Sequence, residues 1–125
     1  MAARDLAKAQ AWADEMNVPT AYGSYEELAA DPGIDAVYVA TVHPAHADAA
    51  RIALEGGKHV LVEKPFTMDA AEARELVELA ASRNLVILEA MWTRWLPHMV
   101  RIREILAEGL LGEVRTVLAD RQVPS

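Results

Sequence analysis

The sequence predicts an α/β fold built on a parallel sheet. Three short apolar runs are separated by longer segments in which apolar residues recur at helical spacing. An order of strand, helix, strand, helix, strand is typical of βαβ units, whose strands lie parallel in one sheet. The runs are apolar at successive positions, which indicates strands covered by helices on both faces, a doubly wound sheet. The three expected strands are residues 35–40, 59–62 and 85–91.

The chain is expected to begin with two helices. Apolar residues at helical spacing predict the first over residues 4–16. Ser24 and Glu27 stand at the S-x-x-E spacing of a capping box, which predicts that a short second helix begins there. Asp31-Pro32-Gly33 is a turn signal that ends this helix before the first strand.

Each connection between the strands also carries a helical pattern. Ala45, Ala49 and Ile52 mark the first of these helices, which Gly56-Gly57 can terminate. The second is opened by another capping box, in which Asp69 and Glu72 stand three residues apart. After the third strand, apolar residues from Trp95 to Leu106 predict a last helix that stops near Gly109, followed by an extended stretch at 113–119.

Composition excludes several classes of protein. The chain has 125 residues, of which 53% are hydrophobic and 25% charged, values that are ordinary for a globular domain. With a net charge of −7 and no basic cluster, we expect no nucleic-acid partner. No apolar run is long enough for a membrane helix and no signal peptide is evident. The chain has no cysteine, which excludes disulfides and thiolate ligands, and a cytoplasmic location is expected.

Polar side chains follow all three expected strands. In open parallel sheets, ligands bind outside the carboxyl ends of the strands. The segments 41–46, 63–66 and 89–94 therefore bring two histidines, a lysine, two acids, a tryptophan and an arginine to one edge of the sheet. The sequence predicts a ligand site at this edge.

Lys64 is the most informative of these residues. It stands between a buried strand and a proline, which restricts its backbone to extended or turn geometry. A fixed ammonium group can bind a carbonyl or hydroxyl oxygen and move a proton while hydride is transferred at the adjacent carbon. The alternative is a surface lysine paired with Glu63.

The other candidates have structural alternatives. His43 and His46 have H-x-x-H spacing, but no third metal ligand is evident, so His46 binds a substrate or serves in helix capping and loop packing. Trp92 lines an apolar pocket or packs in the core. Arg94 binds an anion or pairs with Glu89.

Taken in order, these motifs resemble the Gfo/Idh/MocA family of oxidoreductases. Glu63-Lys64-Pro65 follows a buried strand that is preceded by Gly56-Gly57-Lys58, and Ala40-Thr41 with His43-Pro44-x-His46 matches the family's A-T-x-x-x-x-H loop. The resemblance spans the whole chain and is greatest with the branch of dimeric dihydrodiol dehydrogenases and NADP-dependent D-xylose dehydrogenases. The stretches that carry it are AARDLAKA, AYGSYEELA, VHPAHADAA, EKPFTMDAAEARELV, EAMWTRW and LLGEVRTV.

The resemblance implies a Rossmann-like cofactor domain and assigns roles to residues. Lys64 is implied to be catalytic, His46 to face the substrate, and the bond before Pro65 to be cis. Arg4 follows an expected strand end, where a cation suits the 2′-phosphate of NADP, while Asp5 beside it leaves NAD as the alternative. The expected cofactor contacts are Arg4, Thr41, His43, Glu63, Lys64, Pro65, Trp92 and Arg94, and no metal is expected.

We expect the chain to be a part of a longer family member. None of its six glycines forms the G-x-G-x-x-G loop that binds a pyrophosphate. Residues 1–92 would be a partial Rossmann domain without its first strand, and 93–125 the start of an α+β substrate and dimerisation domain, in a parent that forms homo-oligomers.

The expected function is NADP-dependent transfer of hydride between the nicotinamide and a hydroxyl or carbonyl group of a sugar or cyclic diol. One alternative is a truncated, inactive paralogue that acts as a binding or assembly module. A decarboxylase or lyase on a similar scaffold is another, because fold does not fix function.

Overall fold

The computed structural model describes residues 1–120 and contains two compact units. The first unit is Met1–Ala90 and the second begins at Met91. The break therefore falls close to Trp92, after which the sequence predicts a domain boundary. No helix of the described residues has the length and apolar character needed to cross a membrane.

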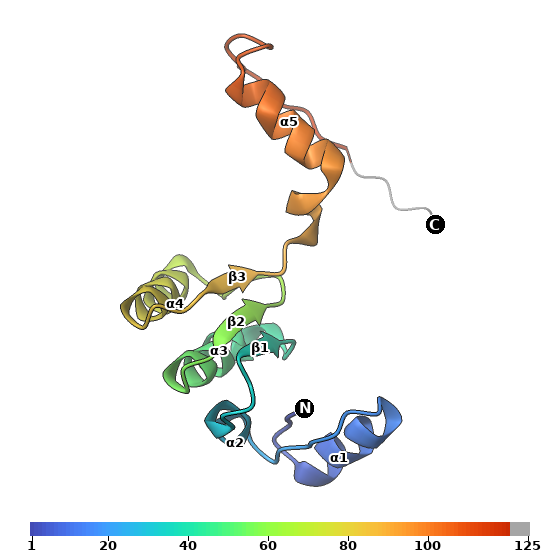
Figure 1. The fold of residues 1–125 in the computed structure, drawn as a ribbon. Coiled ribbons are helices and arrows are strands. Elements are labelled where there is room, and N and C mark those ends of the chain that lie inside the picture. Colours follow the sequence, from blue (N-terminus) through green and yellow to red (C-terminus); the bar gives the residue numbers. More distant parts are fainter. Residues whose placement is uncertain (121–125) are drawn as a thin grey trace. The chain divides into compact units, whose positions relative to one another are not determined.

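A three-stranded parallel sheet lies at the centre of the first unit (Figure 1). The strands are β1 (Ala36–Val39), β2 (His59–Val62) and β3 (Ile87–Glu89), in the spatial order β1-β2-β3. In this register Tyr38 lies opposite Leu61, and Leu61 lies opposite Leu88. All three strands fall within the predicted ranges, and the predicted parallel α/β fold is confirmed.

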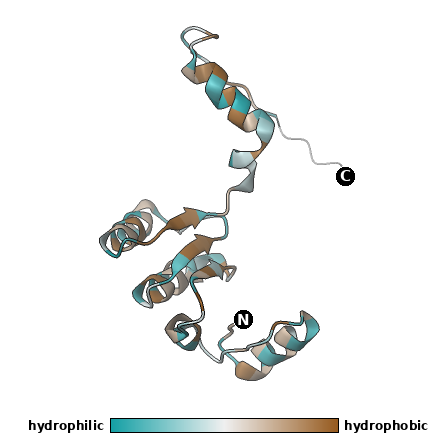
Figure 2. Cartoon of the chain, viewed as in Figure 1, coloured by the Kyte–Doolittle hydropathy of each residue, from teal (hydrophilic) through white to brown (hydrophobic). Residues whose placement is uncertain are grey.

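Two helices connect these strands and cover one face of the sheet. The 3₁₀ turn η1 (His43–Ala45) and helix α3 (His46–Glu55) follow β1, and α4 (Ala70–Ser82) follows β2. The strands contribute buried valines to a core that α3 and α4 complete, and the strands are hydrophobic in Figure 2. The fully buried members of this core with the largest side chains are Leu54, Val62 and Leu76.

The opposite face of the sheet is open in the described residues, where the sequence predicts helices on both faces. Tyr38, Leu61 and Leu88 point away from the core and are 55%, 40% and 52% exposed. Both connections cross the sheet in the same direction, and right-handed crossovers in one direction put their helices on the same side. We call the row Tyr38, Leu61 and Leu88 the open face.

Side-chain caps fix where three of the helices begin. Asp5 precedes α1 (Leu6–Glu15), and its carboxylate accepts hydrogen bonds from the backbone N–H groups of Ala7 (2.9 Å) and Lys8 (3.3 Å). Ser24 precedes α2 (Tyr25–Ala30), and its hydroxyl accepts from the N–H of Glu27 at 3.1 Å. Asp69 caps α4 in the same way. The helix starts predicted from the capping boxes at Ser24 and Asp69 are therefore confirmed.

Helices α2 and α3 pack closely because one residue between them lacks a side chain. A Cβ atom on Gly56 would lie 2.7 Å from the carbonyl oxygen of Ala29 and 2.8 Å from its Cβ. Nearby, the buried Lys58 donates from Nζ to the carbonyl oxygen of Asp31 at 2.7 Å. The phenol of Tyr22 donates to the Asp31 carboxylate, so this turn between α2 and β1 is held from two sides.

The second unit contains the 3₁₀ turn η2 (Trp92–Trp95) and helix α5 (Pro97–Ala107). The predicted helix thus begins after Trp95, because Pro97 suits the first turn of a helix and holds Leu96 in extended geometry. Residues 113–119 form neither helix nor strand. An extended segment becomes a strand only when another strand pairs with it, and within the described part of the chain none does.

Candidate functional site

Six of the predicted site residues lie in the segments that follow β1 and β2, five of them in loops or turns and the sixth, His46, at the start of α3. Thr41, His43 and His46 come after β1, while Glu63, Lys64 and Pro65 come directly after β2. Because β1 and β2 are adjacent and parallel, both loops leave the sheet at the same carboxyl edge. The predicted convergence of these two loops is confirmed by the contacts between them.

His46 joins the two loops from inside the fold. Its side chain is completely buried at the start of α3. One ring nitrogen, Nδ1, lies 2.8 Å from the carbonyl oxygen of Pro65, and Nε2 lies 3.1 Å from that of Thr41. Both ring nitrogens are therefore occupied by backbone groups, one in each loop.

Glu63 connects the second loop to β1. The phenol of Tyr38 donates to Oε1 of Glu63 at 2.5 Å, and the backbone N–H of Lys64 donates to Oε2 at 2.8 Å. These two bonds hold the pKa of Glu63 below its usual value, and the charges on Lys64 and His46 act in the same direction. The bond to Glu63 also raises the pKa of the Tyr38 phenol.

Lys64 itself presents a free ammonium group on this fixed segment. The residue is exposed, and its Nζ forms no ion pair with any carboxylate among the described residues. The surface pairing with Glu63 is thus not formed, since Glu63 bonds the backbone of Lys64 instead. The Lys64–Pro65 peptide bond is cis, as the family resemblance implies.

The next residue is anchored as well. The backbone N–H of Phe66 donates to Oε1 of Glu89, the last residue of β3, at 2.9 Å. Side chains from β1, α3 and β3 therefore all bind the segment from Glu63 to Phe66. Such a frame holds the backbone on both sides of Lys64 while the ammonium group stays available.

Sequence reasoning missed the supporting role of Tyr38. A tyrosine one residue before the end of a strand, next to a strand that is followed by a glutamate, is a signal that could have identified it. For Glu89 the sequence suggests only a pairing with Arg94. Its bond to Phe66 depends on the pairing of β2 with β3, which a linear sequence does not display.

The other predicted residues form none of the hydrogen bonds that hold this frame. Arg4 is exposed and makes no hydrogen bond or ion pair with another described residue, whereas the carboxylate of the neighbouring Asp5 caps α1. His43 is exposed, and its ring meets that of His46 edge to face with centroids 5.6 Å apart. Trp92 and Arg94 belong to the second unit, where both are exposed and the Arg94 carbonyl accepts from Arg103 at 2.6 Å.

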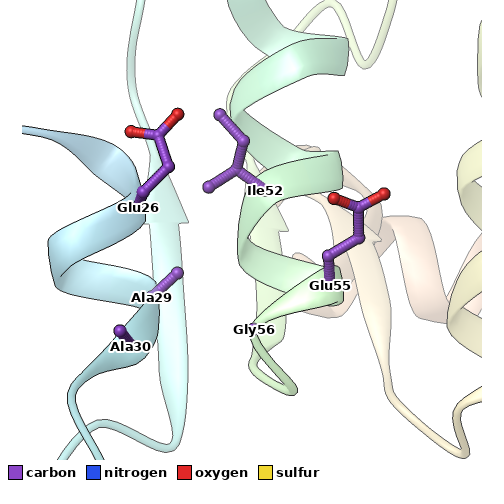
Figure 3. A pocket seen from close by; sticks show the side chains of 6 residues that line it. All are labelled: Glu26, Ala29, Ala30, Ile52, Glu55 and Gly56. Carbon is purple, nitrogen blue, oxygen red and sulfur yellow. The ribbon is translucent and has the colours of Figure 1, made fainter.

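A separate pocket of about 340 Å³ lies between α2 and α3 (Figure 3). It is lined by two carboxylates and small or aliphatic residues, none of which the sequence singles out for chemistry. In the residues that the structure describes, no cluster of three or more His, Asp or Glu side chains could hold a metal ion. The lining residues are Glu26, Ala29, Ala30, Ile52, Glu55 and Gly56.

Comparison with known families agrees with this geometry. Residues 1–91 match the family described as "Oxidoreductase family, NAD-binding Rossmann fold" (GFO_IDH_MocA). The chain belongs to the Gfo/Idh/MocA oxidoreductase family. The family predicted from the Glu63-Lys64-Pro65 motif and the loop after β1 is thereby confirmed.

Several Gfo/Idh/MocA relatives are similar over nearly the whole chain. It is 47% identical to the mouse trans-1,2-dihydrobenzene-1,2-diol dehydrogenase over 120 residues and 48% identical to the human one, which confirms the predicted branch. Each match covers 96% of this chain but only 36% of the relative. The chain thus spans about a third of the length of these curated relatives.

Solved structures of the family share the fold. An NAD-binding oxidoreductase from Klebsiella pneumoniae matches with a TM-score of 0.81 at 30% identity, over 90% of this chain and 30% of that one. KijD10, a 3-ketoreductase from Actinomadura kijaniata in complex with NADP and TDP-benzene, matches with a TM-score of 0.76 at 32% identity. That match covers 91% of this chain and 35% of KijD10.

Proposed function

We propose that this chain supplies the catalytic lysine and part of the cofactor site of an NADP-dependent oxidoreductase. The reaction would transfer hydride between the nicotinamide and a carbon that bears a hydroxyl or carbonyl oxygen, on a sugar or cyclic diol. The observation that carries the proposal is Lys64, whose ammonium group is exposed and unpaired among the described residues while its backbone is held from several sides.

The role of Lys64 follows from the chemistry of the carbon–oxygen bond. When bound, the nicotinamide supplies or accepts the hydride. The substrate oxygen must then gain or lose a proton, and Nζ of Lys64 can hold that proton and bind the oxygen. General acid–base catalysis of this kind contributes about 10²–10⁴-fold to a rate.

The residues present fit the adenosine end of NADP. A 2′-phosphate needs a cation that is not already paired, and Arg4 offers one at the end of the segment that bridges to Tyr22. NAD would need a carboxylate for the ribose hydroxyl, whereas the Asp5 carboxylate is turned toward the start of α1, where its Oδ1 accepts two backbone N–H groups. We propose that Arg4 binds the 2′-phosphate, and that Thr41, His43 and the Glu63–Pro65 segment line the nicotinamide end.

His46 receives a different role from the one that the family resemblance implies. Neither ring nitrogen is available to a substrate in this structure, since each already meets a backbone carbonyl. We therefore propose that His46 positions the loops of the site. The substrate class rests on the relatives, which are named dihydrodiol dehydrogenases, and on the 3-ketoreductase KijD10.

The test has two parts, both on the natural protein that contains these residues. NADPH and NADH binding are compared by nucleotide fluorescence, and hydride transfer is then measured with a panel of cyclic diols and pentoses. Tighter binding of NADPH and turnover with a diol or sugar support the proposal. A folded protein that binds neither nucleotide would overturn it in favour of a binding or assembly module, for which the open face provides apolar surface.

A further inference from the structure

The hydrogen bonds of His46 impose a condition on its protonation. The two groups that face its ring nitrogens are backbone carbonyl oxygens, at 2.8 Å from Nδ1 and 3.1 Å from Nε2. A carbonyl oxygen can only accept a hydrogen bond, and a neutral imidazole carries a single N–H. A neutral His46 could therefore satisfy one carbonyl only, and its second nitrogen would direct a lone pair at the other oxygen.

Burial makes this mismatch costly. The His46 side chain is 0% exposed, so water cannot take the place of the missing donor. An imidazolium, in contrast, donates from both nitrogens and satisfies both carbonyls. Its positive charge would also favour the charged carboxylate of Glu63, in the direction of the lowered pKa of that group.

We propose that His46 is a doubly protonated clamp that ties the loop after β1 to the loop after β2 and so positions Lys64. One N–H of the ring holds the carbonyl of Thr41, and the other holds that of Pro65, the residue joined directly to Lys64. Loss of one proton would release one of the two loops. The positioning of Lys64 therefore weakens as the pH rises, an inference that rests on the function proposed for Lys64.

Several other titratable or charged groups contact the ring, belong to the two loops or lie on α3. His43 meets the ring edge to face, Glu63 and Lys64 follow β2, and Glu89 binds the N–H of Phe66. Within α3 itself, Asp48 is paired with Arg51 at 3.2 Å. The titratable or charged groups to be considered in any pH profile are His43, Asp48, Arg51, Glu63, Lys64 and Glu89.

The first test observes the ring directly by NMR of the protein labelled with ¹⁵N-histidine. The sequence has four histidines, so His46→Asn assigns the signal by its loss. We expect both ring nitrogens of His46 to carry protons at neutral pH, and the backbone amide of Lys64 to shift when one proton is lost. A ring that is singly protonated at neutral pH overturns the proposal.

The second test compares two variants that each keep one donor. The amide nitrogen of asparagine replaces Nδ1 of histidine, and that of glutamine replaces Nε2. His46→Asn should thus keep the bond to Pro65, whereas His46→Gln should keep only the bond to Thr41. Because a misplacement of about 1 Å can cost about 10²-fold in rate, we expect kcat to fall about 10²-fold in His46→Gln and less in His46→Asn, with KM nearly unchanged.

The ranking of the two variants in kcat decides whether the clamp acts through Pro65. If His46→Gln equals or exceeds His46→Asn in kcat, the clamp does not act through Pro65. Circular dichroism confirms that both variants are folded, and the Lys64 amide shift ranks them independently of turnover. A doubly protonated ring in a protein without hydride transfer would refute the proposed function and leave the clamp intact. A singly protonated ring in an active enzyme would refute the clamp and leave the proposed function intact.

Discussion

The Tyr38 phenol and the Glu63 carboxylate form a 2.5 Å hydrogen bond that links β1 to the segment carrying Lys64. Tyr38 lies on the open face, and Glu63 follows β2. The other carboxylate oxygen of Glu63 accepts from the backbone N–H of Lys64. The carboxylate therefore holds the backbone of Lys64 in a fixed position relative to β1.

Tyr38→Phe should raise the pKa of Glu63 toward its ordinary value, because the bond from Tyr38 is the largest cause of its lowering. A carboxylate with a lowered pKa stabilises the fold above its unfolded-state pKa, and this contribution is lost as the pH falls through the folded pKa. The stability lost in Tyr38→Phe should thus be largest at neutral pH and vanish in acid. Urea denaturation and ¹³C NMR titration of Glu63 measure both effects.

Tyr25→Phe is the matched control for this change, since the Tyr25 hydroxyl bonds no other described residue. A Glu63 titration that is the same in the wild type and Tyr38→Phe would contradict the bridge. If both tyrosine variants shift it equally, the effect does not come from the Tyr38 hydrogen bond.

Lys64→Met should abolish most hydride transfer and leave NADPH binding nearly unchanged. Methionine keeps an unbranched side chain that is only one atom shorter, but it removes the proton and the charge. We expect kcat to fall by about 10²–10⁴-fold, measured by NADPH absorbance in the natural protein. The control is Lys8→Met, at an exposed lysine that lies on α1. This variant should retain the wild-type rate. Wild-type turnover by Lys64→Met would remove Lys64 from the chemistry.

Arg4→Ala should reduce the preference for NADPH over NADH. If the guanidinium binds the 2′-phosphate, its loss should weaken the binding of NADPH by about tenfold or more. Hydrogen bonds to charged groups contribute about 1.5–3 kcal/mol. NADH lacks this phosphate and should bind as before. Titrations followed by fluorescence give both affinities. Arg74→Ala provides a control at an exposed arginine of α4, and an equal loss for both nucleotides in Arg4→Ala would argue against the phosphate contact.

Gly56→Ala should destabilise the first unit, because the new methyl group would lie 2.7 Å from the Ala29 carbonyl oxygen. Inserting a methyl group into such a close contact costs about 1–3 kcal/mol. Gly57→Asn is the control for added bulk, since nothing lies within 4 Å of a Cβ there, and asparagine limits the backbone strain that its positive φ of 78° imposes on any side chain. Thermal unfolding distinguishes the two. Equal melting temperatures for Gly56→Ala and the wild type would show that α2 and α3 separate freely.

Much of the fold follows from patterns in the sequence. Apolar runs predict the three strands, and the capping residues Ser24 and Asp69 predict where two helices begin, because these signals are local. The extended stretch predicted at 113–119 does not become a strand, because a strand needs a pairing partner that no local pattern supplies. The helix predicted from Trp95 starts later because Pro97 fixes its first turn.

The position of the site is predicted more fully than its detail. Ligands bind at the carboxyl ends of parallel strands, and this rule alone brings the Lys64 loop beside the loop of His46. H-x-x-H spacing, however, does not tell what a histidine faces across the fold. That both nitrogens of His46 meet carbonyls, and that Tyr38 reaches Glu63, depends on contacts between segments 19 and 25 residues apart.

The open face also affects how this chain behaves in a test tube. Its row of Tyr38, Leu61 and Leu88 exposes aromatic and aliphatic groups on adjacent strands that water solvates poorly. A hydrophobic dye such as ANS should therefore fluoresce with the folded chain, and the apparent molar mass from light scattering should increase with protein concentration. Replacing Leu88 by threonine would keep the strand propensity of β3 and make that surface more soluble.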